Sequence, residues 1–582
     1  MVNKKEIKAF VSGTHNLIDS ELIPADAASE SIGWLTKDGR IELSYGRQAQ
    51  GAEGAAGKSY GEHTGYKTNG TSVRFRKVDT VVQYYDGSAW QDTITGLTAS
   101  DMTFTNYSSV SGNYVYVSSP DDGIFKIVTA NPASYADVND DAVNFKGYMI
   151  IDKARSILWG RTNDPTGLYG SYIDGQDSGV YTTVSGEAVA AVESGTLAFK
   201  AGGSTRSCFG VAITDTSSGE VFTDNYDGTL TGDSGGTGTI NYMTGAFTIT
   251  GQTGAGTADY QWEDSNANGV TDYTESATRA AGEGFNLRQD VGGDAIKLVV
   301  PYDGSYFSFK EKSVYRLTID ATDTNPVNEI VRTDIGVPSL RSAVGTGAGI
   351  LFMNTGDPTK PMMHILKRNV VGDNFDVAPL FSHFKFENYT YTDALLINWD
   401  DYIVVGCQDG TTENNRLLLC NIRENTVSSF SYGIRTATQD NGLLYGGDPV
   451  SKTTYELFSG FDDMGTLIQN EWISADDHYG LPDALKRTKK FRFRGKISPD
   501  QSIKVYVAID EGTFDWVGTI LGSGDYVNYS SSFAIGTSFI GQDVIGGENS
   551  TNAYSFLMQL KVRLGKFRKR QIKFIAQGYG YC

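Results

Sequence analysis

The sequence has few of the residues that mark disulfide frameworks, metal centres or membrane spans. Its 582 residues include 4 cysteines and 5 histidines. So few cysteines in so long a chain do not make a disulfide framework, and the histidines lack the HxH, HExxH or CxxC spacing of zinc sites. No apolar run approaches the roughly 18 residues that a transmembrane helix needs. We therefore expect no membrane span.

Two features bear on the redox state of the protein and on where it is made: a pair of cysteines and the N-terminal segment. Cys407 and Cys420 could lie on the two arms of one hairpin, so a disulfide bridge is conceivable. The alternative that we favour is two small buried side chains in a mostly reduced protein. The N-terminal segment carries a little positive charge but lacks the apolar core of a signal peptide. We expect a protein made in the cytoplasm.

Helix patterns are scarce as well. No stretch of a dozen residues sustains apolar residues at i, i+3, i+4 and i+7, whereas alternation recurs, for example in 72–76 (SVRFR), 114–117 (YVYV) and 491–494 (FRFR). The chain has 68 glycines, 33 tyrosines and 28 phenylalanines but only 13 prolines. Glycine-rich turns between short aromatic and β-branched runs are typical of strands. The sequence predicts an all-β protein.

The chain is too long for one core, which indicates several domains. Short units recur in which a turn rich in Asp and Gly precedes an alternating apolar strand. Most neighbouring units lie about 40 to 55 residues apart, the length of one four-stranded propeller blade. We predict a β-propeller of six or seven blades over residues 71–181 and 284–470. Residues 1–70 are expected to form a leader or docking segment.

The interruption at residues 182–283 predicts an inserted β-domain. This stretch is rich in Gly, Thr, Ser and Asp, and residues 238–250 (GTINYMTGAFTIT) read as two strands around a Met-Thr-Gly turn. Insertions of this kind are tolerated at loop tips. We expect a small domain that projects from the propeller.

Residues 264–275 (DSNANGVTDYTE) match the calcium-loop pattern D-x-[DN]-x-[DN]-G-x5-E at every position. Calcium prefers six to eight hard oxygen ligands, and this spacing can wrap them around one ion. A polar loop without an ion is the alternative. The predicted calcium ligands are Asp264, Asn266, Asn268, Val270 through its carbonyl, Asp272 and Glu275. We expect a structural ion at the exit of the insertion.

Residues 471–582 differ from the rest in charge and predict a basic C-terminal β-sandwich. The whole chain has a net charge of −20, which argues against a protein that coats nucleic acid. The basic residues could dock onto an acidic neighbouring subunit, form a solvated strand face or contact DNA, and we favour them in that order. The predicted docking residues are Lys486, Arg487, Lys489, Lys490, Arg492, Arg494, Lys566, Arg568, Lys569 and Arg570.

Motifs of catalysis are weak. There is no GxSxG elbow, and residues 51–59 (GAEGAAGKS) miss the spacing of a phosphate-binding loop. The adjacent carboxylates Asp121–Asp122, Asp400–Asp401 and Asp462–Asp463 could serve a glycosidase, but adjacent acids also arise in turns. We expect a protein that is not an enzyme.

Two stretches resemble proteins of phage particles. Residues 10–24 (FVSGTHNLIDSELIP), followed by 38–43 (DGRIEL) and 74–86 (RFRKVDTVVQYYD), look like the opening of propeller-type tail proteins. Residues 238–250 are similar to a hairpin repeat of phage tail and baseplate proteins. The resemblance covers about the first 470 residues. The family concerned is the propeller-bearing nozzle, or tail-stabilisation, proteins of short-tailed phages.

The resemblance implies a structural subunit of a virion tail, assembled as a ring, with a hexamer favoured. Other tail, adaptor or portal subunits would be its partners, and passing viral DNA a transient contact. The calcium loop and the C-terminal sandwich have no place in that family pattern. They leave open a receptor- or glycan-binding role in host attachment, with a glycoside hydrolase as a weaker alternative.

Overall fold

The structure is a computed structural model of the chain. The residues that it describes are 12–17, 22–24, 26–37, 40–43, 45–51, 54–109, 112–119, 121–137, 147–152, 155–160, 167–173, 181–198, 208–224, 229–241, 245–252, 254–263, 285–288, 295–318, 327–355, 362–369, 374–460, 462–478, 483–488, 490–497, 502–521, 526–528, 554–561, 564, 566–577 and 580–581.

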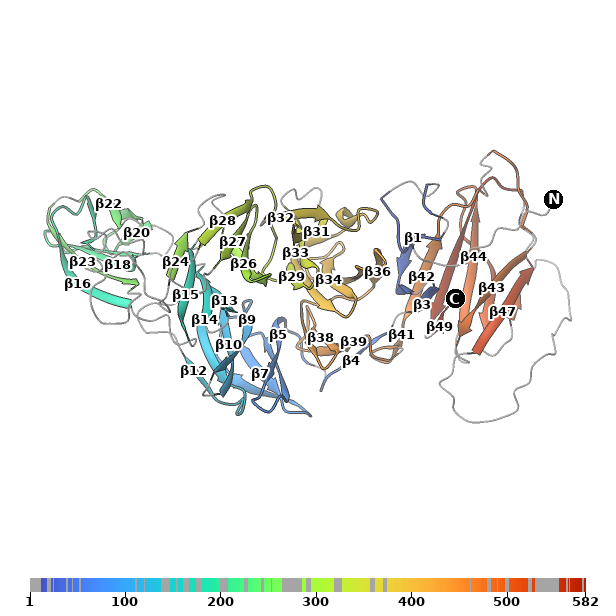
Figure 1. Ribbon diagram of the computed structural model, residues 1–582, viewed down its shortest axis with the longest axis horizontal. Coiled ribbons are helices and arrows are strands. Elements are labelled where there is room, and N and C mark those ends of the chain that lie inside the picture. Colours follow the sequence, from blue (N-terminus) through green and yellow to red (C-terminus); the bar gives the residue numbers. More distant parts are fainter. Residues whose placement is uncertain are drawn as a thin grey trace.

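The middle of the chain forms seven four-stranded antiparallel blades (Figure 1). The first three blades consist of β5 (Ser59–Tyr66), β6 (Ser72–Val78), β7 (Val81–Tyr85) and β8 (Trp90–Ile94); of β9 (Thr103–Ser109), β10 (Gly112–Ser119), β11 (Gly123–Val128) and β12 (Tyr135–Asp137); and of β13 (Gly147–Asp152), β14 (Arg155–Gly160), β15 (Gly167–Ile173) and β24 (Phe285–Arg288).

Four more blades follow. They consist of β25 (Ile296–Tyr302), β26 (Ser305–Lys310), β27 (Val314–Thr318) and β28 (Val327–Arg332); of β29 (Ala343–Thr346), β30 (Gly349–Asn354), β31 (Met362–Arg368) and β32 (Phe375–Pro379); of β33 (Thr390–Trp399), β34 (Tyr402–Gln408), β35 (Arg416–Asn421) and β36 (Thr426–Phe430); and of β37 (Thr436–Asp440), β38 (Leu443–Gly447), β39 (Thr454–Leu457) and β4 (Arg47–Ala49). A short 3-10 helix, η3 (Phe386–Asn388), precedes β33.

The blades close into a ring. The first strand of each blade contacts the first strand of the next, in the order β5, β9, β13, β25, β29, β33 and β37, and β37 contacts β5 again. The last blade is completed by β4 from the N-terminal segment, which pairs antiparallel with β39. The chain is therefore a seven-bladed β-propeller, which confirms the predicted fold class. Residues 47–66, expected in a leader, supply β4 and β5 to this ring.

Apolar side chains between neighbouring blades hold most of the ring together. The alternating strands place one row of side chains on each face of a blade, so each blade buries both faces against its neighbours. Phe75 of β6 and Val115 of β10 share one such cluster, and Phe309 of β26 and Phe352 of β30 share another. Space near the axis is tight: a side chain at Gly65 would meet Val115 at 2.6 Å.

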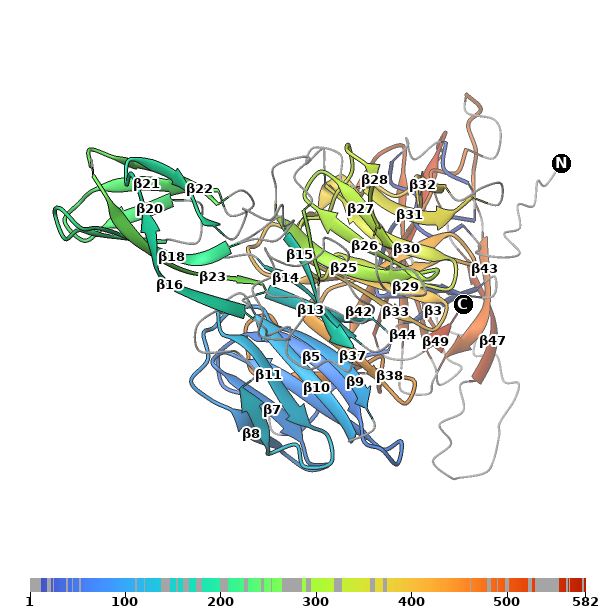
Figure 2. The same cartoon turned by 60° about the vertical axis from the view of Figure 1, so that its left-hand side comes forward.

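The inserted domain is an eight-stranded sheet with its own apolar core (Figure 2). It leaves blade 3 between β15 and β24, as the sequence predicts for a domain at a loop tip. Its strands are β16 (Tyr181–Val189), β17 (Ser194–Thr196), β18 (Cys208–Asp215), β19 (Val221–Asp224), β20 (Thr229–Gly232), β21 (Thr237–Ile240), β22 (Ala246–Thr250) and β23 (Gly256–Glu263).

A two-sheet sandwich is built from both ends of the chain. One sheet extends blade 6 through β1 (Ala28–Ile32), β42 (Gln469–Ser474), β48 (Arg570–Gln577), β44 (Ser502–Ile509), β45 (Asp515–Leu521) and β46 (Tyr526–Asn528). The other contains β2 (Trp34–Lys37), β3 (Arg40–Leu43), β49 (Gly580–Tyr581), β43 (Lys490–Ile497) and β47 (Tyr554–Lys561). Two short strands, β40 (Asp462–Asp463) and β41 (Thr466–Leu467), connect the propeller to it.

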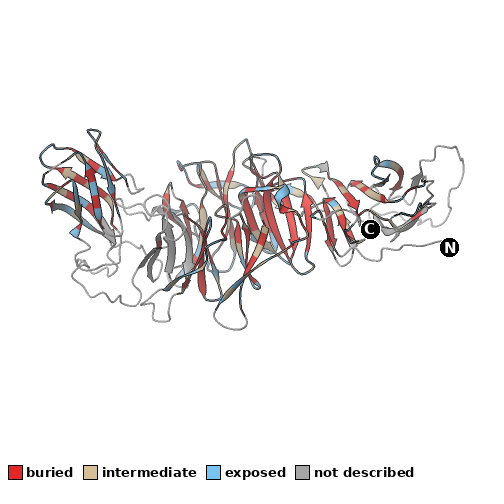
Figure 3. Cartoon of the chain, turned by 90° about the horizontal axis from the view of Figure 1, so that it is seen from above, coloured by how far each residue is buried: buried red, intermediate tan, exposed pale blue. Residues whose placement is uncertain are grey.

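The propeller and the sandwich share one continuous sheet. Strand β1 pairs in parallel with β36, the outer strand of blade 6, and antiparallel with β42 of the sandwich. The resulting ten-stranded sheet runs from the propeller axis to the far edge of the sandwich. The molecule is elongated, with the inserted domain at one end and the sandwich at the other, and buried residues follow the sheets along its length (Figures 1 and 3).

Candidate functional site

The propeller axis holds a cavity of about 500 Å³. Its walls come from the innermost strands of six blades and from the residues just before them. Blades 1, 2 and 7 contribute mostly polar side chains, including His63, Asn106 and Thr436, whereas blades 4, 5 and 6 contribute apolar side chains such as Leu298 and Leu395. The cavity is therefore lined mostly by polar residues towards blades 1, 2 and 7 and mostly by apolar residues towards blades 4, 5 and 6, where Arg341 of blade 5 is a charged exception.

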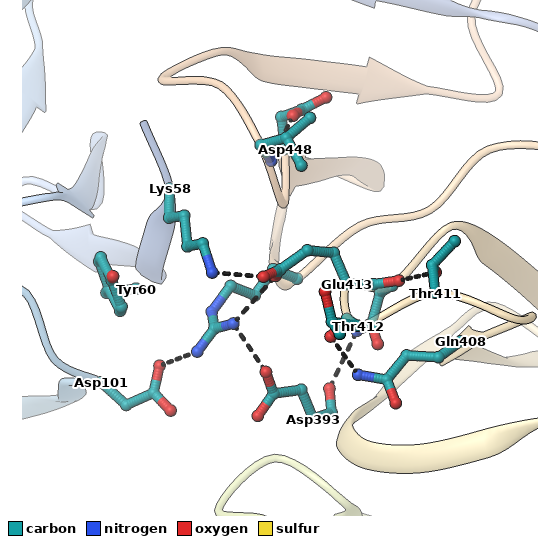
Figure 4. A network of polar contacts seen from close by, with 12 residues as sticks. Lys58, Tyr60, Asp101, Asp393, Gln408, Thr411, Thr412, Glu413 and Asp448 are labelled. Carbon is teal, nitrogen blue, oxygen red and sulfur yellow. Dashed lines mark hydrogen bonds and ion pairs between the residues drawn. The ribbon is translucent and has the colours of Figure 1, made fainter. Parts of the chain in front are cut away.

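A network of ion pairs centred on Arg435 lies at one end of this axis. Figure 4 shows its carboxylates, Asp101, Asp393 and Glu413, gathered close together. Arg435, a residue that is 7% exposed, donates through its guanidinium to Asp101 Oδ1 at 3.1 Å and to Asp393 Oδ2 at 2.8 Å. Its Nη1 lies 3.6 Å from Glu413 Oε2. Burial by itself would lower the pKa of Arg435, but the three carboxylates outweigh that effect and raise it. The guanidinium stays charged.

Two further cations complete the network. Arg341 donates to Asp101 at 2.9 Å, and the Lys58 ammonium pairs with Glu413. Burial would raise the pKa of Asp101, but Arg341 and Arg435 hold it below its usual range. Three cations thus meet three carboxylates, and the cluster has no net charge.

Chain topology explains why these charges meet. Lys58 and Arg435 stand directly before the innermost strands β5 and β37. Arg341 and Asp101 each lie two residues before an innermost strand, β29 and β9 respectively. Strands that start at the same end of the ring bring the residues before them to one mouth. Glu413 comes from the loop between β34 and β35, where Gln408 donates to the Thr412 carbonyl and Thr411 to that of Glu413 (Figure 4). The network ties five blades together.

A second polar cluster lies at the seam where blade 7 meets blade 1. None of the apolar clusters among the described residues joins these two blades. Instead Ser59 bonds Thr436, Thr64 bonds Thr438, and Thr454 donates to the buried Glu62 at 2.7 Å. Burial raises the pKa of Glu62 to about 7, against the opposing effect of Arg76, Thr454 and Arg74.

Cation–π contacts strengthen the same seam. The Arg74 guanidinium lies 3.9 Å from the ring centre of Tyr445 and 4.4 Å from that of Tyr85. Within the sheet of blade 7 itself, Arg47 of β4 lies over Tyr455 at 4.2 Å and donates to Asp463 at 2.6 Å. Such contacts stabilise by about 2 kcal/mol when they are desolvated. The N-terminal strand is thus fastened to blade 7 by charge and aromatic contact.

Sequence reasoning missed both clusters. Their members are separated by up to several hundred positions, and only ring closure makes them neighbours. Arg74 and Arg76 carry a weak signal, since they alternate with Val73 and Phe75 on one strand. That pattern predicts a polar strand face, but the structure buries both faces between blades.

The predicted calcium loop falls outside the described residues. This applies to Asp264, Asn266, Asn268, Val270, Asp272 and Glu275 alike. Within the described part of the chain, no group of three or more His, Cys, Asp or Glu side chains is placed to hold a metal ion. The calcium site stays a prediction.

The predicted basic docking residues divide into exposed and internal ones. Arg487, Lys566 and Arg568 are exposed, whereas Lys486 donates to the carbonyls of Ala484 and Arg568. Lys569 is half-buried between Asp476 and Glu511.

Arg570 is buried: it donates to Thr488 at 2.8 Å, pairs with Asp477 at 3.4 Å and lies over Phe491. It therefore holds the sandwich together from inside. The side chains of Lys489, Lys490, Arg492 and Arg494 lie outside the description, while Phe491 and Phe493 of the same strand face the sandwich core.

Cys407 and Cys420 are free and buried, and the register places Cys407 opposite Arg416 and Cys420 opposite Ile403. Burial raises the pKa of both thiols well above the usual value. The three carboxylate pairs considered for catalysis lie in or beside turns: Asp122 accepts from Thr98 and Lys77, Asp401 faces Arg423, and Asp463 pairs with Arg47.

Comparison with known proteins adds two distant likenesses. No protein-family model and no curated protein matches the chain. A catalytically inactive virginiamycin B lyase from Staphylococcus aureus, solved with quinupristin, is 8% identical over 71% of this chain and 99% of its own, with a TM-score of 0.32. Apo AztD from Citrobacter koseri is 10% identical over 70% and 96%, with a TM-score of 0.31. The fold assignment rests on the sheets of this chain itself.

Among the described residues, no helix is long and apolar enough to cross a membrane.

Proposed function

We propose that this chain is a structural subunit of a bacteriophage tail, assembled with further copies into a ring, with a hexamer favoured. The observation that carries the proposal is the ten-stranded sheet that unites blade 6 with the sandwich through β1. A shared sheet fixes the two modules relative to each other through main-chain hydrogen bonds. A rigid, elongated subunit of this kind suits a structural role in a larger assembly.

Genome passage, in this proposal, occurs between subunits and not along the propeller axis. Duplex DNA has a major groove that is itself about 12 Å wide. A cavity of about 500 Å³, crossed at one mouth by the Arg435 ion pairs, is too small for it. A net charge of −20 also favours a passage that does not retain DNA.

Docking between copies, or onto adaptor and portal subunits, is assigned to the exposed part of the basic cluster. Arg487, Lys566 and Arg568 stand together, because Lys486 and Phe567 form a bridge between their segments. In a strongly acidic protein a local positive patch orients the approach of an acidic neighbour.

The test is assembly of the purified protein, followed by light scattering and electron microscopy, together with antibody labelling of phage particles. We expect closed rings with an open lumen, and labelling of the tail. Reversing the three exposed charges to Glu should abolish rings at moderate salt while leaving the melting temperature unchanged. The matched control is Arg423→Glu, at an 81% exposed position of the propeller. A monomer that is absent from particles would refute the proposal.

A receptor-binding role is the second candidate, and the projecting inserted domain favours it (Figure 2). A domain held at the far end of the molecule reaches partners that the propeller itself does not.

A further inference from the structure

One face of the inserted domain is covered by a regular ladder of threonine side chains. Three neighbouring strands each carry the pattern Thr-x-Thr, with sequences TLT in β20, TGT in β21 and TIT in β22. The register places these threonines directly opposite one another, in the pairs Thr229–Thr239, Thr231–Thr237, Thr237–Thr250 and Thr239–Thr248. The three motifs therefore form rungs across the sheet.

The two neighbouring strands, β19 and β17, each add one hydroxyl residue to the ladder. Thr223 of β19 lies opposite Thr231, and Ser194 of β17 lies opposite Thr248. All these hydroxyl residues are exposed, whereas the residues between them, such as Leu230 and Ile249, are buried in the domain core. One face of the five strands is thus apolar and packed, and the other is a field of hydroxyls.

The preference of threonine for strands explains each threonine by itself, but it does not explain why the whole exposed face lacks charged residues. Threonine favours strands, and opposed threonine pairs stabilise a sheet. Exposed sheet faces normally carry interspersed charges for solubility, and 20% of this chain is charged. Yet the exposed positions of these five strands hold no Lys, Arg, Asp or Glu. Within these five strands the exposed face is therefore neutral and hydrogen-bonding, and the nearest acidic residues, Glu193 and Asp233, stand at strand ends.

The geometry of the ladder indicates the chemistry of a ligand. Neighbouring strands lie about 4.8 Å apart, and residues i and i+2 of one strand about 6.6 Å apart, so the hydroxyls form a two-dimensional grid. Each threonine hydroxyl donates one hydrogen bond and can accept two, with a methyl group beside it. A neutral grid of this kind complements a polymer that itself presents hydroxyls and CH groups at short, regular intervals.

Two features make the grid suited to a polymer and not to a single sugar. The hydroxyls of Thr239 and Thr248 bond each other at 2.7 Å, which holds their rotamers and reduces the ordering that binding requires. Each hydroxyl contact contributes little by itself, but a chain that spans several rungs gains from effective concentration. Strands β20 and β22 also lie at the end of the molecule remote from the sandwich, where a long polymer has access (Figure 1).

We propose that the threonine ladder of the inserted domain is a docking surface for a neutral polysaccharide. Recognition is by hydroxyl-to-hydroxyl bonding along several successive sugars. The proposal does not depend on ring assembly or on a place in a phage tail, so each can fail while the other stands.

The experiment measures co-sedimentation of the full-length protein with four neutral polysaccharides: cellulose, chitin, cross-linked dextran and insoluble galactomannan. We expect retention by at least one of them, with competition by its oligosaccharides and not by its monosaccharide. The triple variant Thr231→Val, Thr237→Val and Thr248→Val keeps the shape and strand preference but removes three hydroxyls. It should lower the bound fraction at least tenfold with the melting temperature unchanged.

The matched control makes the same threonine-to-valine substitutions outside the ladder, in the propeller. Thr71→Val, Thr98→Val and Thr390→Val alter three exposed threonines of the propeller and should bind like the parent protein. If the ladder variant is unstable, the double variant Thr229→Val with Thr250→Val makes the same test. The proposal is overturned if no polysaccharide retains the protein, or if the ladder variants bind like the parent.

Discussion

At the scale of single residues, buried charged side chains connect some blades of this propeller, whereas apolar contacts connect most of the others. Arg435 links carboxylates from three different segments, and Glu62 lies in a seam without an apolar cluster. Buried charges are costly to leave unpaired, so such residues make a structure sensitive to single changes.

Replacing Arg435 by Met should destabilise the propeller by about 3 kcal/mol, because three carboxylates lose a shared buried cation. The figure is below the top of the usual range since Asp101, Asp393 and Glu413 are partly exposed. Urea unfolding followed by tryptophan fluorescence measures the change.

Arg423→Met is the control, because its pair with Asp401 is exposed and should contribute no more than about 1 kcal/mol. Equal effects of the two substitutions would contradict the assignment.

Glu62 should make stability depend on pH. Its pKa is about 7 in the folded chain and 4.5 as a free side chain, so the folded state holds the proton more tightly. Stability contributed by the protonated form is complete below pH 4.5 and is lost as pH rises towards 7. The variant Glu62→Gln cannot lose a proton. Relative to the parent it should gain up to about 3 kcal/mol over this range, since one pKa unit is about 1.4 kcal/mol.

The measurement is the urea midpoint of both proteins at pH 4.5, 6 and 8. Any constant offset from the amide itself cancels in the comparison across pH. A difference that stays flat from pH 4.5 to 8 would show that folding does not raise the pKa of Glu62, and would contradict the prediction.

At the scale of elements, the N-terminal strands join parts of the fold that are distant in sequence. Strand β1 lies between blade 6 and the sandwich, β2 and β3 belong to the sandwich, and β4 completes blade 7. Gly33, between β1 and β2, has a φ of +70°, and a side chain there would meet Asn470. The chain therefore turns sharply from one sheet of the sandwich to the other at this glycine.

Trp34→Ala should test this role of the N-terminal strands. Trp34 is fully buried against Phe491, Trp472 and Phe574, so truncation should cost about 3–5 kcal/mol. Because blade 6 shares a sheet with the sandwich, amide exchange should accelerate in β44, β48 and also β36. The inserted domain, with a separate core, should keep its protection. Tyr135→Ala, at an exposed position, is the control, and equal acceleration everywhere would contradict the coupling.

At the scale of the whole molecule, three β modules of different make-up are joined in line (Figure 1). The propeller buries both faces of its blades, the sandwich draws on both ends of the chain, and the inserted domain has its own core. Independent cores unfold as separate units unless a shared sheet couples them. Calcium, if bound beside the inserted domain, would act on that unit.

Chelation should therefore lower one melting transition and leave the others. Ligands that bind only the folded state raise its stability, so EDTA should reduce the melting temperature of the inserted domain if residues 264–275 hold calcium. Calorimetry with and without EDTA measures this. The variant Asp264→Ala with Glu275→Ala should melt like the chelated parent. Identical melting of all four samples would exclude a stabilising calcium ion.

The sequence by itself determined the strand content, the blade length and the place of the insertion. Alternating apolar residues and glycine-rich turns are local signals, and each is complete within about ten residues. They predict a strand at 72–76 and two strands within 238–250 without knowledge of any partner. These local signals leave the number of blades open between six and seven, because they do not show which strand completes the last blade.

Only the tertiary structure decided how the ring closes and where the charges meet. Strand β4 joins β39 across about 400 residues, and Lys58, Asp101, Arg341 and Arg435 reach one mouth because their strands start at the same end of the ring. The buried position of Arg570 and the exposed threonine ladder depend equally on register and on neighbouring strands. Pairing between segments that are distant in sequence depends on how the whole chain packs, and the local periodicity of the sequence does not predict it.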